Sequence, residues 1–319
     1  MPCPLPHVIT STSCESACAW IAENRSLIEE LLNTQGGALL RGFRVIEKQD
    51  FQEAFSAYCN DALRYVYRST PRTDLGGGVY TATEYPQGLP IPLHNENSYQ
   101  REWPLLIMFC CLRPADNKTG QTPLADIVRV TDRIDAEIRR LFLKKKVKYI
   151  RNYRPHIDLP WQKVFQTEST ADVNLYCIEH DIEAHWSSDG SLRTEQVCEA
   201  LAVHPVSGLT VWFNQAHLFH PSSLDQRTRK LMLKMFPEDG FPRNVTFGDG
   251  TPIEESMLTE VRKAFEHETV TFEWNQGDIL ILDNMRVAHG RTPFSGQRRV
   301  LTAMGRPYSP PATIHDVPG

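Results

Sequence analysis

The sequence lacks an apolar run long enough to cross a membrane. It has no uninterrupted apolar stretch of 18 residues, whereas a transmembrane helix needs about 20 predominantly apolar residues. Residues 1–20 also lack both the basic start and the continuous apolar segment of a secretory signal. We therefore expect a cytoplasmic protein without a membrane partner.

Two further features are missing, namely paired cysteines and an excess of positive charge. None of the eight cysteines forms a CxxC pair, and Cys110 and Cys111 lie in an apolar run, which is typical of reduced, buried thiols. The net charge is −5, whereas nucleic-acid binding needs a concentrated basic patch. The one basic cluster, residues 144–148, is interpreted as a solvated helix end, so no nucleic-acid partner is expected.

The hydrophobic pattern that is present predicts a mixed α+β protein with a mainly β core. Thr12 and Glu15 have capping-box spacing before a helical pattern that ends at Gly36. Further helices are expected near residues 50–55, 134–142 and 257–265. Strands are expected at 37–43, 105–112, 147–153, 208–215, 277–284 and 298–304.

The arrangement of these elements favours one domain over residues 1–319. There is no internal repeat, low-complexity segment or linker, and the regular βαβ alternation of a doubly wound sheet is absent. Residues 69–93 and 154–200 are expected to be long loops that shape a substrate pocket. The glycines at 76–78 lack the following Lys-Ser/Thr of a phosphate loop.

His94 and Glu96 form a candidate metal-binding pair. In extended backbone, side chains at i and i+2 point to the same side, so the imidazole and the carboxylate can reach one ion. His289, just beyond a buried strand, could complete the set of two histidines and one carboxylate that binds non-haem Fe(II). Arg299 offers a planar fork for a carboxylate and Thr122 offers a hydroxyl, which together suggest a pocket for a dicarboxylate cosubstrate.

These stretches resemble the TauD/TfdA superfamily of Fe(II)/2-oxoglutarate-dependent dioxygenases. The resemblance is closer to the clavaminate synthase-like and syringomycin-biosynthesis-type members, which use HxE rather than HxD. The matching segments occur in family order from about residue 38 to 305, and they read LLRGF, LHNENSY, GQTPLAD, VWFNQ and GDILILDNMRVAHGRTPFSGQRR.

Carried over by position, the resemblance makes His94, Glu96 and His289 the iron ligands. Thr122 would hydrogen-bond 2-oxoglutarate, and Arg299 would pair with its distal carboxylate, with Arg298 as the alternative because only one of two strand neighbours faces the pocket. The candidates for substrate contacts are Asn95, Asn97, Tyr99 and Asn214.

The resemblance also implies a fold and a reaction. The fold is a double-stranded β-helix, or jelly roll, with flanking helices and with residues 12–60 packed on the core. The cofactor set is Fe(II), 2-oxoglutarate and O₂, and the expected reaction is hydroxylation of an unactivated C–H in an amino acid or a carrier-bound aminoacyl group, in specialised-metabolite biosynthesis. Desaturation or cyclisation, a zinc-dependent hydrolase and a non-catalytic binding protein are the alternatives, and the sequence leaves the oligomeric state open.

Two details of the sequence narrow the expected substrate and reaction. Taurine-using members carry a second arginine four positions after the cosubstrate arginine, and here that position is Ala303, which argues against a sulfonate held in that way. Related halogenases leave the carboxylate position vacant for chloride, whereas Glu96 fills it.

Asp283 and Asn284 are interpreted as orienting the turn before His289 or its ring.

Four other histidines offer weaker alternatives for a metal site. His217 and His220 stand at i and i+3, and His180 and His185 flank an acidic patch. No strand that carries an arginine is predicted directly after either pair. We therefore favour structural roles for these four histidines.

Overall fold

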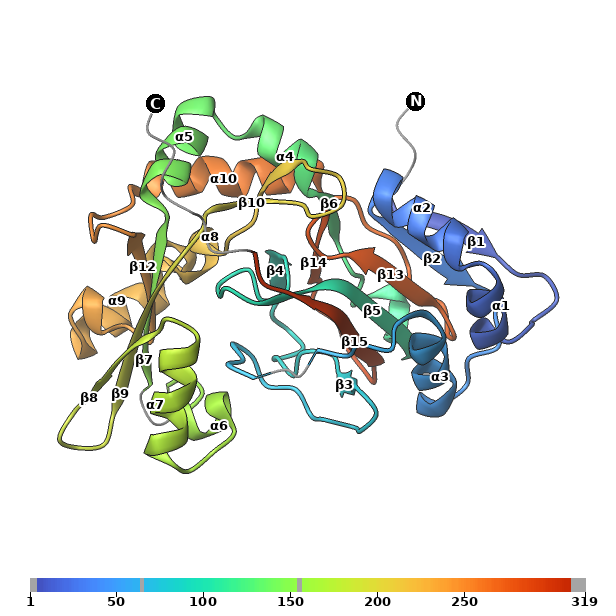
Figure 1. Ribbon diagram of the computed structural model, residues 1–319, viewed down its shortest axis with the longest axis horizontal. Coiled ribbons are helices and arrows are strands. Elements are labelled where there is room, and N and C mark those ends of the chain that lie inside the picture. Colours follow the sequence, from blue (N-terminus) through green and yellow to red (C-terminus); the bar gives the residue numbers. More distant parts are fainter. Residues whose placement is uncertain (1–4, 64–65, 154–156, 311–319) are drawn as a thin grey trace.

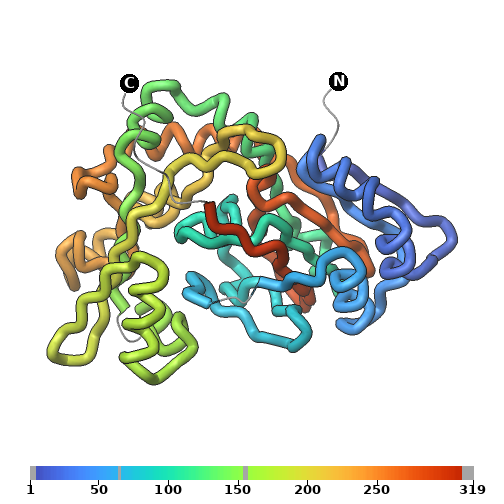
Figure 2. Tube along the Cα trace, in the orientation of Figure 1, coloured from blue at the N-terminus to red at the C-terminus, as the bar shows by residue number. Residues whose placement is uncertain are grey.

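The largest sheet in the computed structural model has six strands and forms one wall of the core (Figure 1). The structure describes residues 5–63, 66–153 and 157–310. In spatial order the strands are β1 (His7–Thr10), β2 (Gly37–Arg41), β13 (Ile279–Asp283), β5 (Trp103–Arg113), β15 (Arg299–Tyr308) and β3 (Val79–Thr81). All neighbours pair antiparallel except β1 and β2. Figure 2 shows the consequence, because the blue N-terminal segment lies beside the red C-terminal strands.

Both faces of this sheet are buried, and alternate residues serve opposite sides. On one face, Leu106, Met108 and Cys110 of β5 pack in a cluster with the N-terminal helices α1 (Ala17–Glu23), α2 (Arg25–Gln35) and α3 (Lys48–Tyr58). On the other face, Ile107, Phe109 and Cys111 belong to a second cluster that fills the space toward the smaller sheets. The N-terminal segment therefore covers the outside of the core.

A three-stranded sheet lies across that second cluster and carries the predicted iron ligands. Its order is β4 (Ile91–His94), β14 (Val287–Arg291) and β6 (Leu124–Asp126). Leu124 and Val287 join the cluster that the large sheet lines. The two sheets thus enclose a common apolar interior, with β14 in the middle of the smaller one.

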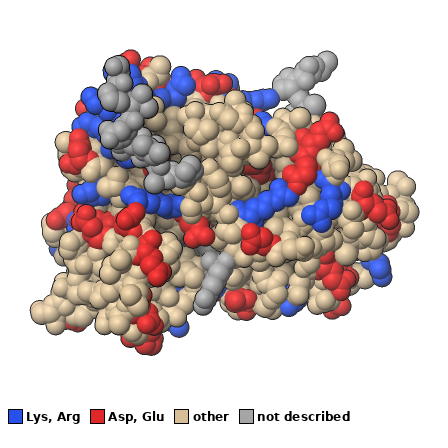
Figure 3. All heavy atoms as spheres, in the orientation of Figure 1, with Lys and Arg blue, Asp and Glu red and all other residues tan. Residues whose placement is uncertain are grey.

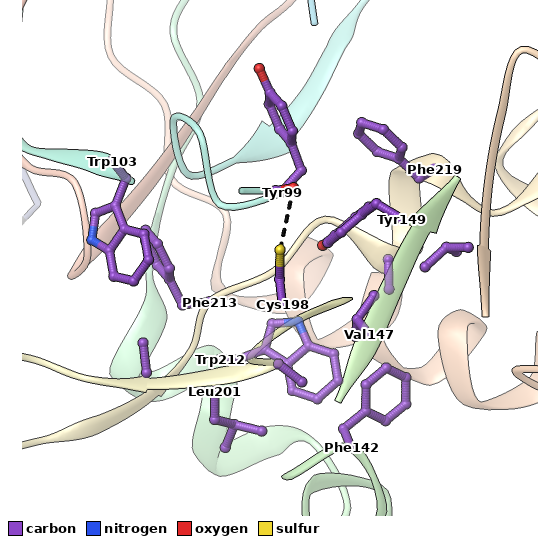
Figure 4. Close-up of a cluster of buried hydrophobic side chains, with 14 of the residues drawn as sticks. Tyr99, Trp103, Phe142, Val147, Tyr149, Cys198, Leu201, Trp212, Phe213 and Phe219 are labelled. Atoms are coloured by element: carbon purple, nitrogen blue, oxygen red, sulfur yellow. Dashed lines mark hydrogen bonds between the residues drawn. The ribbon is translucent and has the colours of Figure 1, made fainter. Parts of the chain in front are cut away.

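The third region of the fold contains a four-stranded sheet and a short hairpin. The strands are β12 (Arg243–Phe247), β7 (Val147–Tyr153), β9 (Leu192–Cys198) and β8 (Glu183–Trp186), and the hairpin is β10 (Leu201–Val203) with β11 (Thr210–Trp212). The helices are α4 (Ile127–Arg133), α5 (Ala136–Lys145), α6 (Trp161–Phe165), α7 (Thr170–Glu179), α8 (Ala216–Phe219), α9 (Gln226–Met235) and α10 (Glu255–Glu268), with 3-10 turns η1 (Asp116–Lys118), η2 (Pro221–Ser223) and η3 (Glu238–Gly240). Figure 4 shows the aromatic cluster that joins these elements.

The predicted strands at 37–43, 105–112, 147–153, 208–215, 277–284 and 298–304 are all confirmed, with shifted ends, as are the three helices near 50–55, 134–142 and 257–265. The loop prediction for residues 154–200 is wrong, because α6, α7, β8 and β9 lie within it. Residues 69–93 hold β3 and most of β4 within an otherwise irregular segment. Residues 154–156 lie outside the described part of the chain.

The first predicted helix is divided in two at Asn24. This residue ends α1 and begins α2, and its side-chain Nδ2 donates to the carbonyl of Trp20. The capping box predicted from Thr12 and Glu15 is wrong, since α1 begins after Ser16. Gly36 ends α2 with a φ of 79°, as its position in the sequence predicts, because glycine adopts this left-handed conformation without strain.

The surface carries charges of both signs, as the sequence composition predicts. On the face shown in Figure 3, Lys and Arg side chains are interspersed with Asp and Glu. Within the described residues, none of the helices has both the length and the apolar character needed to cross a membrane. The cytoplasmic location and the single-domain organisation stay predictions.

Candidate active site

Strands β4 and β14 bring two of the predicted iron ligands face to face. His94 and His289 are direct partners in the antiparallel pairing, and their ring centroids are 4.7 Å apart. Glu96 follows β4, and its Oε2 lies 3.8 Å from Nε2 of His289. One ligand atom from each of the three residues lies within 4.8 Å of the others. This is the donor set of a non-haem iron site, with coordination positions left over.

The hydrogen bonds of the two rings also suit a metal. Nδ1 of His94 donates to the carbonyl of Pro92 at 2.8 Å, which leaves Nε2 as the lone-pair donor. His289 is 4% exposed, and neither ring nitrogen has a hydrogen-bond partner among the described residues. A buried imidazole without a partner is costly unless an ion or water satisfies it, so the residues present fit a divalent cation.

A buried arginine neutralises the carboxylate of the triad. Arg72 Nη2 donates to Glu96 Oε2 at 2.5 Å, and both side chains are almost completely buried. Burial alone would raise the pKa of Glu96, but the Arg72 guanidinium holds it below its usual range. Burial lowers the pKa of His94 to about 4. Both ligands are therefore in their metal-binding protonation states at neutral pH.

Asn284 fixes the backbone that carries Glu96. Its Oδ1 accepts from the Glu96 N–H at 2.7 Å, and its Nδ2 donates to the carbonyls of Glu96 at 2.9 Å and Pro104 at 2.8 Å. Asn95 Nδ2 in turn donates to the Asn284 carbonyl. The turn before β14 is thereby tied to the segment that follows β4, so the two ligand-bearing segments are held as one unit.

Asp283 shapes the turn before β14. Its Oδ1 accepts from the N–H groups of Met285 and Arg286, and its Oδ2 accepts from Nε2 of His204 at 2.8 Å. The sequence interpretation of Asp283 as a turn residue is therefore confirmed. Asn284, by contrast, acts on Glu96, and neither residue contacts the His289 ring in the described hydrogen bonds.

A cavity opens beside the triad. It is lined by Arg72, Ala82, Thr83, Ile91, His94, Phe109, Thr122, His289, Gly290, Arg291, Arg298 and Val300. Three arginines, Arg72, Arg291 and Arg298, contribute to this lining, and no Asp or Glu does. Such a cavity favours an anionic ligand next to the metal.

The structure places Arg298 in the cavity and Arg299 outside it. Arg298 Nε donates to the carbonyl of Gly120 at 3.1 Å, and burial lowers its pKa to about 10. No carboxylate forms a salt bridge with Arg298 among the described residues. Arg299 is exposed and is absent from the lining. The geometry favours Arg298 for the cosubstrate carboxylate, whereas the sequence interpretation preferred Arg299.

Strand alternation explains this difference. Val300 and Met304 belong to the interior cluster, whereas Leu301 and Ala303 belong to the helix-covered cluster. Arg298 shares the parity of the interior residues. Four positions after Arg298 comes Thr302, not Ala303, and Thr302 is also uncharged. The argument against a sulfonate held by a second arginine therefore applies whether Arg298 or Arg299 binds the cosubstrate.

Gly120 lets Arg298 approach the GQTP segment. Its φ is +66°, and a Cβ at this position would lie 2.9 Å from Cδ of Arg298. Only glycine tolerates both conditions. The same segment supplies Thr122, which is 3% exposed and lines the cavity. The arginine and the hydroxyl therefore meet at the same end of the cavity.

Arg291 has a different task from the other two arginines. Its guanidinium donates to the carbonyls of Tyr85, Pro86 and Leu89 at 3.2, 2.7 and 3.0 Å. These bonds fasten the irregular segment before β4 against the cavity wall. Arg72 and Arg291 were not recognised from the sequence, because their partners lie far from them along the chain.

The four residues suggested as substrate contacts do not line the cavity. Asn95 bonds to Asn284, as described above, and Asn214 bonds to the backbone of Ala200 and Ala216. Tyr99 donates to the Tyr67 carbonyl and packs in the aromatic cluster of Figure 4. Asn97 is 2% exposed and adopts a φ of 59° in the turn after Glu96. The geometry supports structural roles for Asn95, Tyr99 and Asn214, and it places Asn97 away from the lining.

The four remaining histidines named in the sequence analysis have local roles. His217 Nε2 donates to the Leu93 carbonyl, and His220 Nδ1 accepts from the Ser222 N–H. His180 stacks on Tyr176, and His185 lies near Glu183 on an exposed strand. Within the described residues, the group of three or more potential ligands that could hold an ion is His94, Glu96 and His289.

Comparison with known proteins agrees with this geometry. The family model described as taurine catabolism dioxygenase TauD, TfdA family matches residues 6–304. The chain is 40% identical to the dapdiamide synthesis protein DdaC of Enterobacter agglomerans over 89% of this chain and 86% of that protein. It is 30% identical to a clavaminate synthase-like protein of Arabidopsis thaliana, with the same two coverages.

Solved structures share the fold at low sequence identity. PvcB of Pseudomonas aeruginosa superposes with a TM-score of 0.52 at 13% identity, over 93% of this chain and 84% of that one. AAD-2, solved with Mn(II) and N-oxalylglycine, gives a TM-score of 0.54 at 10% identity, over 96% and 95% of the two chains. These matches confirm the mixed jelly-roll fold predicted above.

The resemblance noted in the sequence is thus confirmed by relatives that span most of the chain. The expected cofactor set of Fe(II), 2-oxoglutarate and O₂ is confirmed with it, since the protein has the matching metal triad. The chain belongs to the TauD/TfdA family, whose members are Fe(II)/2-oxoglutarate-dependent oxygenases.

Proposed function

We propose that this chain hydroxylates an unactivated C–H bond of an amino acid, free or bound to a carrier protein, in specialised-metabolite biosynthesis. The observation that carries the proposal is the shared cavity, in which His94 and His289 of the metal triad line the same space as Arg298 and Thr122. The relative with 40% identity is named for dapdiamide synthesis, which supports a role in making a specialised metabolite.

In this proposal the triad holds Fe(II), and Arg298 and Thr122 hold the distal carboxylate of 2-oxoglutarate. A guanidinium offers a charge-assisted fork to a carboxylate, and the charge of Arg298 has no carboxylate partner among the described residues. AAD-2 was solved with Mn(II) and N-oxalylglycine, a divalent metal with a dicarboxylate of the same length as 2-oxoglutarate. The same pairing of ligands suits this cavity.

The iron, when bound with 2-oxoglutarate and O₂, supplies the oxidising power for C–H cleavage. The protein positions the substrate and excludes water. Ile91, Phe109 and Val300 give the cavity apolar walls, which favour an aliphatic portion of the substrate beside the metal. Glu96 fills the carboxylate position and leaves no place there for a halide, which favours hydroxylation over halogenation.

The proposal is tested by combining a binding measurement with product analysis. Anaerobic protein with Fe(II) and 2-oxoglutarate should develop the visible metal-to-ligand charge-transfer band of a chelated complex. A panel of amino acids and carrier-bound aminoacyl groups should then yield succinate, consume O₂ and give a product heavier by one oxygen atom. A product lacking two hydrogens would indicate desaturation or cyclisation, and turnover without O₂ uptake would indicate a hydrolase.

The neighbouring arginines provide a matched pair of variants. Arg298→Gln should weaken 2-oxoglutarate binding by roughly 10- to 100-fold, the range of a charge-assisted hydrogen bond. Arg299→Gln should leave it unchanged, because that side chain is exposed. Absence of the charge-transfer band in the wild-type protein would refute the oxygenase proposal. Equal effects of the two substitutions would refute the assignment of Arg298.

A further inference from the structure

A tryptophan outside the cavity lining donates a hydrogen bond to the hydroxyl of Thr122. Trp274 Nε1 lies 3.0 Å from Thr122 Oγ1, and the two residues are 7% and 3% exposed. An indole N–H can only donate a hydrogen bond. The oxygen of Thr122 is therefore the acceptor in this contact, and its own hydrogen is left to donate elsewhere.

The hydroxyl hydrogen has no other partner among the described residues, and Thr122 lines the cavity. Arg298 reaches the same end, since its Nε bonds to Gly120, two residues before Thr122. A guanidinium also has donors only. Trp274 occupies one of the two lone pairs of the Thr122 oxygen, so Thr122 could accept from a ligand only by leaving its own buried hydrogen without a partner. This end of the cavity therefore favours a ligand group that accepts hydrogen bonds.

We infer that Trp274 is a specificity-determining positioning residue, which holds the Thr122 hydroxyl as a donor and so makes this end of the cavity select a carboxylate over a carboxamide. The inference rests on the proposed function, in which this end receives the distal carboxylate of 2-oxoglutarate. A carboxylate accepts from every donor here. A carboxamide would turn its N–H₂ toward donors, and a buried donor without an acceptor is penalised.

Trp274 acts through Thr122 and not by contact with the ligand. It does not line the cavity. Its ring packs edge-on against Phe272, with centroids 4.7 Å apart, in the interior cluster that includes Leu124 and Val300. This packing fixes the indole ring. Its N–H then occupies one lone pair of the Thr122 oxygen, which restricts rotation of the hydroxyl.

The test compares 2-oxoglutarate with 2-oxoglutaramate, in which the distal carboxylate is an amide. Both are titrated anaerobically into Fe(II)-loaded protein, and the dissociation constants are read from the charge-transfer band. Trp274→Phe should weaken 2-oxoglutarate binding by about three- to tenfold, the value of one hydrogen bond. Binding of the amide should weaken less or improve, because the freed hydroxyl can then accept from the amide.

Trp212→Phe is the matched control. Trp212 is fully buried in the aromatic cluster of Figure 4, and its Nε1 has no hydrogen-bond partner among the described residues. This substitution makes the same change from indole to phenyl without removing a hydrogen bond. The dissociation constant of 2-oxoglutaramate divided by that of 2-oxoglutarate should therefore stay at the wild-type value. An unchanged ratio in Trp274→Phe overturns the inference. If that variant folds poorly, Trp274→Met, whose side chain has no hydrogen-bond donor, should show the same fall in this ratio.

Two further variants separate this inference from the proposed function. Thr122→Val and Arg298→Gln should each weaken 2-oxoglutarate binding, and if neither does, the proposed cosubstrate pocket is refuted. If both do while Trp274→Phe does not, the inference alone fails. In Thr122→Val protein the additional Trp274→Phe substitution should have no further effect on 2-oxoglutarate, and a full additive loss would contradict the coupling.

Discussion

Arg72 and Glu96 form a buried ion pair at the edge of the metal site, with 2.5 Å between Nη2 and Oε2. The arginine comes from the irregular segment before β4, and the carboxylate comes from the turn after it. The pair thus places a fixed positive charge beside an atom that is also proposed to face a divalent cation. The two cations share one carboxylate, and this sharing can be measured.

Removing Arg72 should make the protein depend more strongly on metal. In Arg72→Met the Glu96 carboxylate is left buried without its partner, which costs roughly 3–5 kcal/mol in the free energy of unfolding. A bound divalent cation restores the compensation. Thermal unfolding with and without Mn(II) should therefore show a larger metal-induced rise in the melting temperature for the variant than for the wild type.

Arg140→Met is the control for this substitution. Arg140 pairs with Glu137 on the surface, where both side chains are 74% exposed, and such pairs contribute about 0–1 kcal/mol. Its stability and its response to Mn(II) should match the wild type. A metal-induced shift that is equal in Arg72→Met and the wild type would contradict the shared-carboxylate interpretation.

Asn284→Ala should weaken metal binding without touching a ligand. It removes the hydrogen bonds to both backbone groups of Glu96, so the carboxylate loses its fixed position. Residues that orient metal ligands typically contribute 10- to 100-fold in affinity, and a loss of about that size is expected. Anaerobic titration with Fe(II) or Mn(II) measures it.

Asn214→Ala provides the comparison. Asn214 is equally buried and also loses two backbone hydrogen bonds, but these lie away from the triad. Its stability should fall while its metal affinity stays near the wild-type value. If both variants lose metal affinity to the same extent, general destabilisation explains the effect and the Asn284 clamp does not.

The stability of the fold should decline on acidification through His217. Burial lowers the pKa of this ring to about 3, whereas an unfolded histidine titrates near 6.5. The unfolded state therefore binds a proton first. The contribution is fully present above pH 6.5 and is lost as the pH falls toward 3, at roughly 1.4 kcal/mol per pH unit.

Denaturant unfolding at several pH values would show this. His217→Gln retains a donor for the Leu93 carbonyl but cannot titrate, so its stability should change less between pH 6.5 and 4. His185→Gln, on an exposed strand, should keep the wild-type slope. A wild-type slope in His217→Gln would assign the acid sensitivity to other groups.

The strands and the pair of His94 and Glu96 were accessible from the sequence because they rest on short-range patterns, whereas the assignment of His289 rested on the family resemblance. The period of two in β7 and the spacing of His94 and Glu96 are visible in a few residues. Arg298 was not separable from Arg299, because both faces of β15 are buried and its apolar residues therefore do not indicate which parity faces the cavity. Arg72 and Trp274 gain their roles only from partners that the fold brings near.

The helices and strands within residues 154–200 were missed for a related reason. The buried side of β9 carries two polar residues, Thr194 and Gln196, so apolar alternation does not identify this segment as a strand. Tertiary contacts with β7 supply what local sequence does not.

The pairing of His94 with His289 has a consequence for how this enzyme can change. The two ligands are joined by the register of β4 against β14, and β6, which lies in the stretch of chain between them, pairs with the other edge of β14. Connections in this stretch can lengthen, shorten or be exchanged between relatives while the iron site stays assembled. One residue inserted within either strand would instead turn a ligand to the opposite face of the sheet. New substrate preferences can therefore be recruited through the intervening loops, whereas these two short strands cannot tolerate an insertion.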